Sequence, residues 1–227
     1  MHKLAALLAA ASLTLSACSG AAMAAEEAVK APAATRTAAE GKGLKTAIFA
    51  GGCFWGVEAV FSHVKGVTGV VSGYHGGTRR SATYDLVSGG VTDHAEAVKV
   101  TYDPAVIRYD QLLRIYFSVV ADPTLKNRQG PDVGAQYRSA LVPTNAEQSA
   151  VAKAYIAQLS KAGLWSRPIV TRIEPMKAFY PAEAYHQDFM LNNPRHGYIV
   201  RWDAPKVAAL KAMYPGVWRA GFLKDAG

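Results

Sequence analysis

The stretch LKTAIFAGGCFWGVEAVF, residues Leu44–Phe61, decides how the folded domain begins. Its first part is a short apolar run that closes on two glycines, a pattern that indicates a strand followed by a turn. From Phe54 onward the apolar side chains recur at helical spacing. The sequence therefore predicts a strand, a glycine turn and a helix, with Cys53 at the start of that helix.

A cysteine at a helix start is a candidate nucleophile. Free backbone N–H groups and the positive end of the helix dipole stabilise a thiolate there, so we expect the pKa of Cys53 to fall from about 8.5 toward neutrality. The small residues before Cys53 leave room for a substrate, whereas Phe54 and Trp55 are either core aromatics or the wall of a pocket. The alternative is a buried free cysteine that packs as a small hydrophobe.

The rest of the chain alternates between strand and helix patterns. Strands are predicted within 66–77, 94–104, 136–143 and 168–175, and helices within 109–120, 145–163 and 181–193. The order β-α-β-β-α-β-α-β-α predicts an α+β fold, a two-layer sandwich with a split βαβ, ferredoxin-like core. The last residues show little periodicity, so we expect a long C-terminal coil with a short helix near 205–214.

The composition is that of one globular domain. The chain has 227 residues, of which 50% are hydrophobic, and it shows no internal repeat. The formal net charge is +8, but the basic residues are scattered, which is typical of a solvated surface and argues against a nucleic-acid partner. We expect a monomer with one folded domain over 44–227.

The N-terminus indicates export. The apolar run after Lys3 is too short to span a bilayer and is typical of a secretory signal peptide, here residues 1–18. It ends in the lipobox-like LSAC, which predicts lipidation of Cys18 and a membrane-anchored periplasmic lipoprotein. Cleavage after AMA at 22–24 is the alternative and would release a soluble periplasmic protein. Residues 19–43 lack aromatics, and a flexible tether is expected there.

The cysteine count isolates Cys53. If Cys18 is lipidated or removed, the mature chain has no second cysteine, which excludes a structural disulfide and a zinc site built from several cysteines. A lone thiol is a liability in an oxidising compartment. Its presence there therefore favours a chemical role.

Glu96 is a candidate to work with Cys53. It lies in the otherwise apolar strand segment HAEAVKV, and a buried carboxyl tends to stay protonated and can then donate a proton. The alternative is a glutamate that faces solvent from a half-buried strand.

Other spacings are weaker signals. The H-x-E at His94 lacks the P-C-x-x-C that should follow it in a zinc deaminase. EAYH, Glu183–His186, has a metal-site spacing, but no second such pair accompanies it. A Cys-His-Asp hydrolase stays open, because His75, His94 and His186 are all available as the base and no local motif selects one.

Several segments together resemble the A-type peptide methionine sulfoxide reductases. GGCFWGVEAVF looks like the signature of that family, and further segments match it in order and spacing from about Thr46 to Tyr198. They are SGYHGG (72–77), YDLVSGGVTDHAEAV (84–98), YDP (102–104), DPTLKNRQGPDVGAQYRS (122–139) and FYPAEAYHQDF (179–189). The resemblance implies that 44–227 is a catalytic domain that reduces methionine sulfoxide, usually the S epimer, free or within proteins.

The resemblance also implies roles for individual residues. Cys53 attacks the sulfoxide sulfur and becomes a sulfenic acid, and Glu96 supplies the proton that the departing oxygen requires. The implied substrate-binding residues are Phe54, Trp55, Tyr74, Asp132 and Tyr137.

These substrate-binding residues would act in three ways. Phe54 and Trp55 would form the apolar wall around the S-methyl group. The hydroxyls of Tyr74 and Tyr137 would hydrogen-bond the sulfoxide oxygen. Asp132 would bind the substrate backbone or order the site.

One departure from the family concerns regeneration. Many relatives carry a second cysteine in a C-terminal segment like NPxGYC, but this chain reads NPRHGYI, with Ile199 at that position. An external thiol must then reduce Cys53: a thioredoxin-like or glutaredoxin-like protein, or a small thiol. No bound cofactor and no metal are expected. Two other functions stay open, a thiol peroxidase that uses the same cysteine and a non-catalytic envelope lipoprotein that binds oxidised or apolar peptides.

Overall fold

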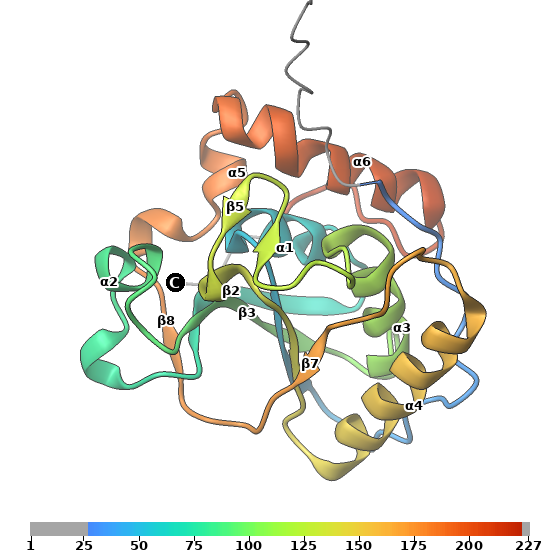
Figure 1. Ribbon diagram of the computed structural model, residues 1–227. Coiled ribbons are helices and arrows are strands. Elements are labelled where there is room, and N and C mark those ends of the chain that lie inside the picture. Colours follow the sequence, from blue (N-terminus) through green and yellow to red (C-terminus); the bar gives the residue numbers. More distant parts are fainter. Residues whose placement is uncertain (1–26, 224–227) are drawn as a thin grey trace, which may run out of the picture.

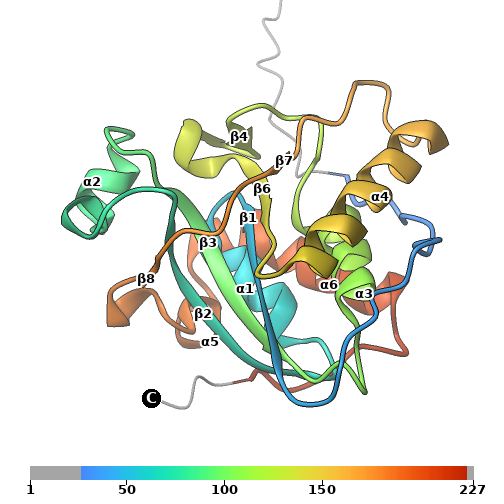
Figure 2. The same ribbon diagram turned by 90° about the horizontal axis from the view of Figure 1, so that it is seen from below.

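The computed structural model describes residues 27–223 (Figure 1). The predicted signal peptide over 1–18, the lipidation site Cys18 and the alternative cleavage site at 22–24 lie outside the described residues. A twisted sheet crosses the middle of the described chain, and helices pack against it (Figure 2).

The main sheet has six strands in the order β7-β6-β1-β3-β2-β8. A separate two-stranded sheet pairs β4 with β5. The strands are β1 (Lys45–Gly51), β2 (Val67–His75), β3 (Ala95–Tyr102), β4 (Arg128–Gln129), β5 (Asp132–Val133), β6 (Ser139–Val142), β7 (Arg172–Ile173) and β8 (Phe179–Pro181).

The sheet confirms the predicted α+β fold with its split βαβ core. Both β1 and β2 pair antiparallel with β3, which lies between them, so β1 and β2 run parallel to each other. Parallel strands need a crossover connection, and α1 (Phe54–Ser62) provides it. The four central strands, β6-β1-β3-β2, form the ferredoxin-like core, and β7 and β8 extend its edges.

The helices follow the predicted pattern in the first two thirds of the chain, apart from the short α2 (Tyr84–Ser88), which was not predicted, and they depart from the pattern later. The helix expected over 181–193 is reduced to the turn Ala184–His186 and to α5, because the backbone of Asp188 has a left-handed φ of 53°. The expected C-terminal helix is α6, preceded by a π-helical turn, Ile199–Asp203. The remaining helices are α2 (Tyr84–Ser88), α3 (Tyr109–Ile115), α4 (Ala146–Ala162), α5 (Phe189–Asn192) and α6 (Ala204–Met213). Within residues 27–223, none of the helices has the length and apolar character that crossing a membrane requires.

The core occupies both faces of the central strands. On β1 the side chains alternate, and Phe49 belongs to the large cluster formed with the helices, whereas Ile48 belongs to a smaller cluster on the other face. The ring of Phe49 stacks on Phe61 of α1 with a centroid separation of 4.9 Å and lies 5.7 Å from the ring of Tyr116. This packing fixes α1, and hence its first residues, against the sheet.

The structure corrects the predicted flexible tether for its described part. Residues 28–40, here called the N-terminal strap, lie on the domain, and Ala31 and Ala38 are buried. The backbone N–H of Ala31 donates to Ser118 Oγ at 3.1 Å, and that of Ala38 donates to Asp110 at 2.9 Å. Small alanine side chains allow this close approach, and the polar composition that suggested disorder instead supplies hydrogen bonds to the helices.

Candidate active site

Cys53 lies between the end of β1 and the first turn of α1. Gly52 has a φ of +90°, and a Cβ on it would fall 2.6 Å from the Cβ of Gln129, so a glycine is required at this turn. Cys53 is the N-cap residue of α1. The residue as a whole is partly exposed, and it lines a small cavity beside the β4–β5 loop and the C-terminal segment.

Glu96 lies on β3, and its side chain contacts the first turn of α1. It is 1% exposed, near the beginning of β3, and its carboxylate accepts the backbone N–H of Phe54 at 3.0 Å. The solvent-facing alternative is therefore wrong. Burial raises the pKa of Glu96 to about 8, and the charges of Asp132 and Asp203 add to this, whereas the Phe54 N–H opposes it. At neutral pH the carboxyl is mostly protonated and has a proton to give.

The predicted fall in the pKa of Cys53 is contradicted. Burial raises the pKa of the thiol well above its ordinary value, and the charges of Glu96 and Asp203 raise it further. A hydrogen bond with the backbone of Trp55 is the one interaction that lowers it. The helix start does attract negative charge, but Glu96 already takes the Phe54 N–H, so the thiol receives only part of the stabilisation that an empty helix terminus would give.

Two tyrosines come near the Cys53 and Glu96 pair. Burial, followed by the charges of Glu96 and Cys53, raises the pKa of Tyr84 to about 12. Burial and the charge of Glu96 likewise raise the pKa of Tyr137 above its usual range, and the charge of Cys53 contributes. Tyr137 was predicted from the sequence, whereas Tyr84, the first residue of α2, was missed. The segment YDLVSGGVTDHAEAV contains it, but no local pattern distinguishes its hydroxyl from those of other tyrosines.

Tyr74 has a different environment from the one expected. It faces Glu96 across the β2–β3 pair, and its ring lies 5.9 Å from that of Phe54. However, its hydroxyl donates to the carboxylate of Glu183 at 2.7 Å. The same carboxylate accepts the backbone N–H of Tyr84 at 2.9 Å. Glu183 thus joins β2 to the start of α2, and through it Tyr74 helps to hold Tyr84 in place.

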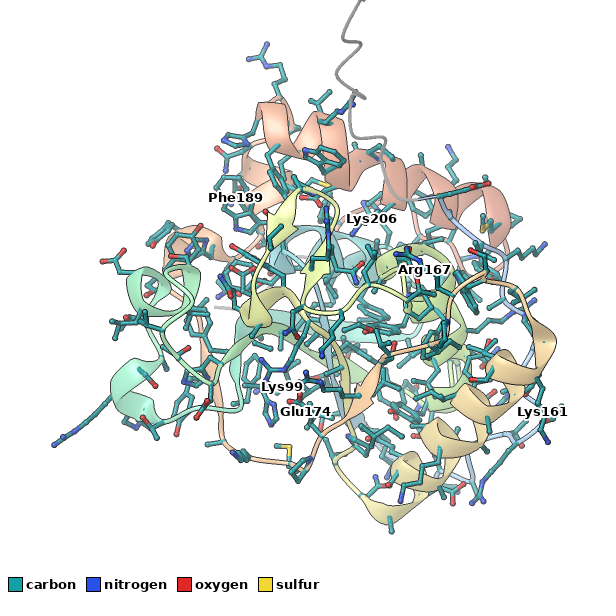
Figure 3. All side chains as sticks on the ribbon, in the orientation of Figure 1. Lys99, Lys161, Arg167, Glu174, Phe189 and Lys206 are labelled. Carbon is teal, nitrogen blue, oxygen red and sulfur yellow. The ribbon has the colours of Figure 1, made fainter. Side chains whose placement is uncertain are left out.

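Trp55 is held on two sides. Its indole N–H donates to Nδ1 of His186 at 3.0 Å, and its ring stacks on Phe189, labelled in Figure 3, with centroids 3.6 Å apart. The EAYH segment therefore positions aromatic residues, with Glu183 and His186 bound to different partners. Among residues 27–223, no group of three or more His, Cys, Asp or Glu is placed to hold a metal ion.

Asp132 lines the same cavity as Cys53. It is the first residue of β5, and its carboxylate accepts the hydroxyl of Tyr198. Tyr198 lines the cavity beside Cys53, and its ring meets that of Trp55 edge-on at 5.9 Å. Tyr198 is a further site residue that was not singled out from the sequence, although it directly precedes Ile199 in the GYI segment.

The three histidines considered as a catalytic base are bound elsewhere. His94 Nδ1 accepts the Gly77 N–H, and its Nε2 contacts a backbone carbonyl. His75 Nε2 accepts the Lys177 N–H, and His186 is bound to Trp55. These bonds give no support to a Cys-His-Asp hydrolase.

Comparison with known proteins covers nearly the whole described domain. A family model described as peptide methionine sulfoxide reductase matches residues 45–215. The chain is 56% identical over 176 residues to "Peptide methionine sulfoxide reductase MsrA 2" of Mesorhizobium japonicum, covering 78% of this chain and 90% of that protein. It is 51% identical over 173 residues to the protein of the same name from Synechocystis, covering 76% of this chain and 81% of that protein.

Solved structures give the same result. The chain resembles Mxr1 from Saccharomyces cerevisiae in reduced form, with a TM-score of 0.60 and 36% identity over 67% of this chain and 87% of that one. It also resembles methionine sulfoxide reductase A of Corynebacterium diphtheriae, with a TM-score of 0.58 and 33% identity over 68% of this chain and 77% of that one. On this likeness of sequence and fold, the chain belongs to the peptide methionine sulfoxide reductase family, as an enzyme of the MsrA type.

Proposed function

We propose that this enzyme reduces methionine S-sulfoxide, free or within proteins, by attack of Cys53 on the sulfoxide sulfur, and that an external thiol then reduces the Cys53 sulfenic acid. The observation that carries the proposal is the position of Glu96. It is a buried carboxyl with a pKa of about 8, bound to the N–H of Phe54, the residue next to the nucleophile. A carboxyl in this state can protonate an oxygen that must leave.

The proton balance follows from the resting state. Burial raises the pKa of both Cys53 and Glu96, so both hold their protons at neutral pH. As Sγ of Cys53 bonds to the sulfoxide sulfur, the oxygen takes the proton of Glu96, and the thiol proton passes to Glu96. The S–O bond and the new bond between Sγ and the methionine sulfur then both break, as the hydroxyl is transferred to Sγ. Methionine sulfur gains the two electrons that Cys53 loses, which leaves methionine and a sulfenic acid.

The surrounding side chains support the same reaction. Phe54 and Trp55 offer apolar surface for the S-methyl group. We assign the hydrogen bonds to the sulfoxide oxygen to Tyr84 and Tyr137, because the charges of Cys53 and Glu96 act on both hydroxyls. Tyr74 then supports Tyr84 through Glu183, in place of the direct role expected from the sequence.

Regeneration is proposed to need a thiol from outside the chain. Cys53 is a free cysteine, and Ile199, at the position of the second cysteine of many relatives, is fully buried. The family is thiol-dependent and uses no bound cofactor. A thioredoxin-like or glutaredoxin-like protein, or a small thiol, would therefore attack the sulfenic acid.

We further propose that the enzyme repairs proteins in the cell envelope, held there by a lipid on Cys18. The support is the sequence of residues 1–18, with its apolar run and LSAC ending. The mass of the mature N-terminal peptide tests this proposal. A diacylated Cys18 supports it, and an N-terminus that begins after residue 24 would instead mean a soluble periplasmic protein.

The stoichiometry of a single turnover tests the chemistry. Without reductant, one equivalent of methionine S-sulfoxide is expected to give one equivalent of methionine and one sulfenic acid, with no intramolecular disulfide. Mass spectrometry of the mature protein measures this. A loss of two mass units on oxidation would contradict the single-thiol mechanism. Turnover of hydrogen peroxide that exceeds turnover of the sulfoxide would favour a thiol peroxidase, and no methionine at all would favour a binding protein.

A pair of tyrosine variants tests the revised assignment. Tyr84→Phe removes a hydroxyl near the reacting oxygen and is expected to lower kcat/KM about tenfold or more, with Tyr137 supplying the remaining hydrogen bond. Tyr74→Phe keeps that hydroxyl and is expected to cost about 1 kcal/mol of stability, with a much smaller effect on kcat/KM. Steady-state kinetics and thermal unfolding of the two variants give the comparison. The assignment to Tyr84 is wrong if Tyr74→Phe loses as much kcat/KM.

A further inference from the structure

Asp203 is a buried carboxylate that the proposed attack on the sulfoxide does not use. It is 1% exposed and is the last residue of the π-helical turn that leads into α6. Its side chain lies against the first turn of α1, so close that a Cβ on Gly56 would fall 2.2 Å from Oδ1. A glycine at position 56 is what allows this approach.

The carboxylate of Asp203 shares a cavity with the nucleophile. Both Cys53 and Asp203 line it, together with Tyr198 and Lys206. Asp203 comes to this cavity from the C-terminal segment, which passes over α1 as Figure 1 shows, whereas Glu96 reaches the helix start from β3. The two carboxyl groups therefore approach Cys53 from different elements, one from the sheet and one from the C-terminal segment.

The position of Asp203 provides one feature that stabilises a carboxylate, although its burial acts in the opposite direction. The first turn of a helix carries a positive partial charge, and Asp203 lies against that turn of α1. Asp132 lines the same cavity, and its carboxylate accepts the hydroxyl of Tyr198. Asp203 is thus a carboxylate placed at the cavity of the nucleophile, where it can accept a proton.

We propose that Asp203 is the general base of the regeneration step, accepting the proton of the external thiol as that thiol attacks the Cys53 sulfenic acid. The proposal rests on the proposed function, since it requires the sulfenic acid to form. Asp203 lies in the same C-terminal segment as Ile199, the position at which many relatives have their second cysteine. Under the proposal, this segment takes part in regeneration through Asp203 instead of through a cysteine.

The step balances with groups already at the site. The S–H bond of the incoming thiol breaks, and its proton passes to Asp203. An S–S bond forms to Cys53, and the S–O bond of the sulfenic acid breaks. The departing hydroxyl takes the proton of Glu96 and leaves as water. The external thiol is oxidised and Cys53 is reduced to the disulfide level, after which a second thiol releases it.

The experiment uses Asp203→Asn, which keeps the size of the side chain and removes the base. The mature protein is loaded with one equivalent of methionine S-sulfoxide, and the loss of the sulfenic acid is then followed with two probes. With 2-mercaptoethanol at pH 7, which is largely protonated, the variant is expected to react about tenfold or more slowly. With 5-thio-2-nitrobenzoate, whose thiol is already ionised, it is expected to react at least as fast as the wild type.

This pair of thiols separates a base from a structural role. A variant that slows both thiols equally, or neither, overturns the proposal. Asp110→Asn is the matched control, because Asp110 is a buried carboxylate on α3 that is bound to Arg108 and to the N-terminal strap. Asp110→Asn is expected to leave the rates with both thiols unchanged. If it slows the reaction with 2-mercaptoethanol as much as Asp203→Asn does, the proposal is wrong. The methionine burst before thiol addition separately tests the proposed function.

The wild-type protein provides a measurement that does not depend on a folded variant. If only free thiolate attacks, the rate constant for 2-mercaptoethanol falls tenfold for each pH unit below the thiol pKa. Base catalysis by Asp203 makes this fall shallower between pH 8 and pH 6. If the wild-type rate constant falls a full tenfold per pH unit, the proposal is contradicted. If it falls less steeply in the wild type and tenfold per pH unit in Asp203→Asn, the proposal is supported.

Discussion

Replacement of Cys53 by serine is expected to remove measurable reduction of methionine sulfoxide, a loss on the order of 10⁴-fold or more in kcat. The physical reason is that a serine oxygen is a poor nucleophile toward sulfur and cannot accept the sulfoxide oxygen as a sulfenic acid. Release of methionine from methionine S-sulfoxide, with dithiothreitol as reductant, measures the effect.

The control for this variant is its stability and its binding of substrate. Cys53 is partly exposed, so the serine variant is expected to unfold at nearly the same temperature as the wild type. Calorimetric binding of methionine sulfoxide is likewise expected to persist, because the apolar wall is intact. If Cys53→Ser retains full activity, every enzymatic role assigned to this site is wrong.

Glu96→Gln is expected to slow the formation of the sulfenic acid by about a hundredfold or more at pH 7, with a small effect on substrate binding. Glutamine can still accept the Phe54 N–H through its carbonyl oxygen, so the local geometry is kept, but it has no acidic proton. Single-turnover production of methionine, without reductant, isolates this step from regeneration.

The pH dependence of the same step gives a second result. Because the pKa of Glu96 is about 8, the wild-type rate constant is expected to be level below about pH 7 and to fall as the pH rises through 8, where the carboxyl loses its proton. Glu96→Gln is expected to show no such fall. An unchanged single-turnover rate in the variant would rule out an acid role, and a wild-type rate that rises through pH 8 would mean that ionisation of Cys53 controls the step.

The beginning of the domain was predictable because its signals are local. The apolar run, the glycine pair and the helical spacing after Phe54 each depend on neighbouring residues, and β1, the turn and α1 follow them. The split βαβ arrangement then follows from the order of the elements and the need for a crossover between parallel strands.

The electrostatics of the site depend on residues that are far apart in the chain. The prediction for Cys53 considered only its own helix, but burial and the charges of Glu96 and Asp203, which come from β3 and the C-terminal segment, raise the pKa of the thiol. The same is true of Tyr84. Its place beside the site depends on Glu183, which is 99 residues away and binds its backbone N–H.

Composition misled the tether prediction for the N-terminal strap, residues 28–40. An alanine-rich segment without aromatics has little apolar surface to bury, which is why disorder was expected. Its attachment depends on surfaces that other segments form, and such complementarity has no signature in the segment itself. The short β8 strand was missed for a related reason, since its pairing with β2 is decided by the edge of the sheet that it meets.

The N-terminal strap also constrains the order of assembly of the chain. Glu40 accepts a hydrogen bond from the hydroxyl of Tyr102, 62 residues further on, and Thr35 binds Gln158 of α4, 123 residues further on. Closing loops of this size costs conformational entropy that is recovered only once α3 and α4 present their surfaces. We therefore expect the strap to be secured only after α3 and α4 have packed, so that the described domain is completed from its centre outward.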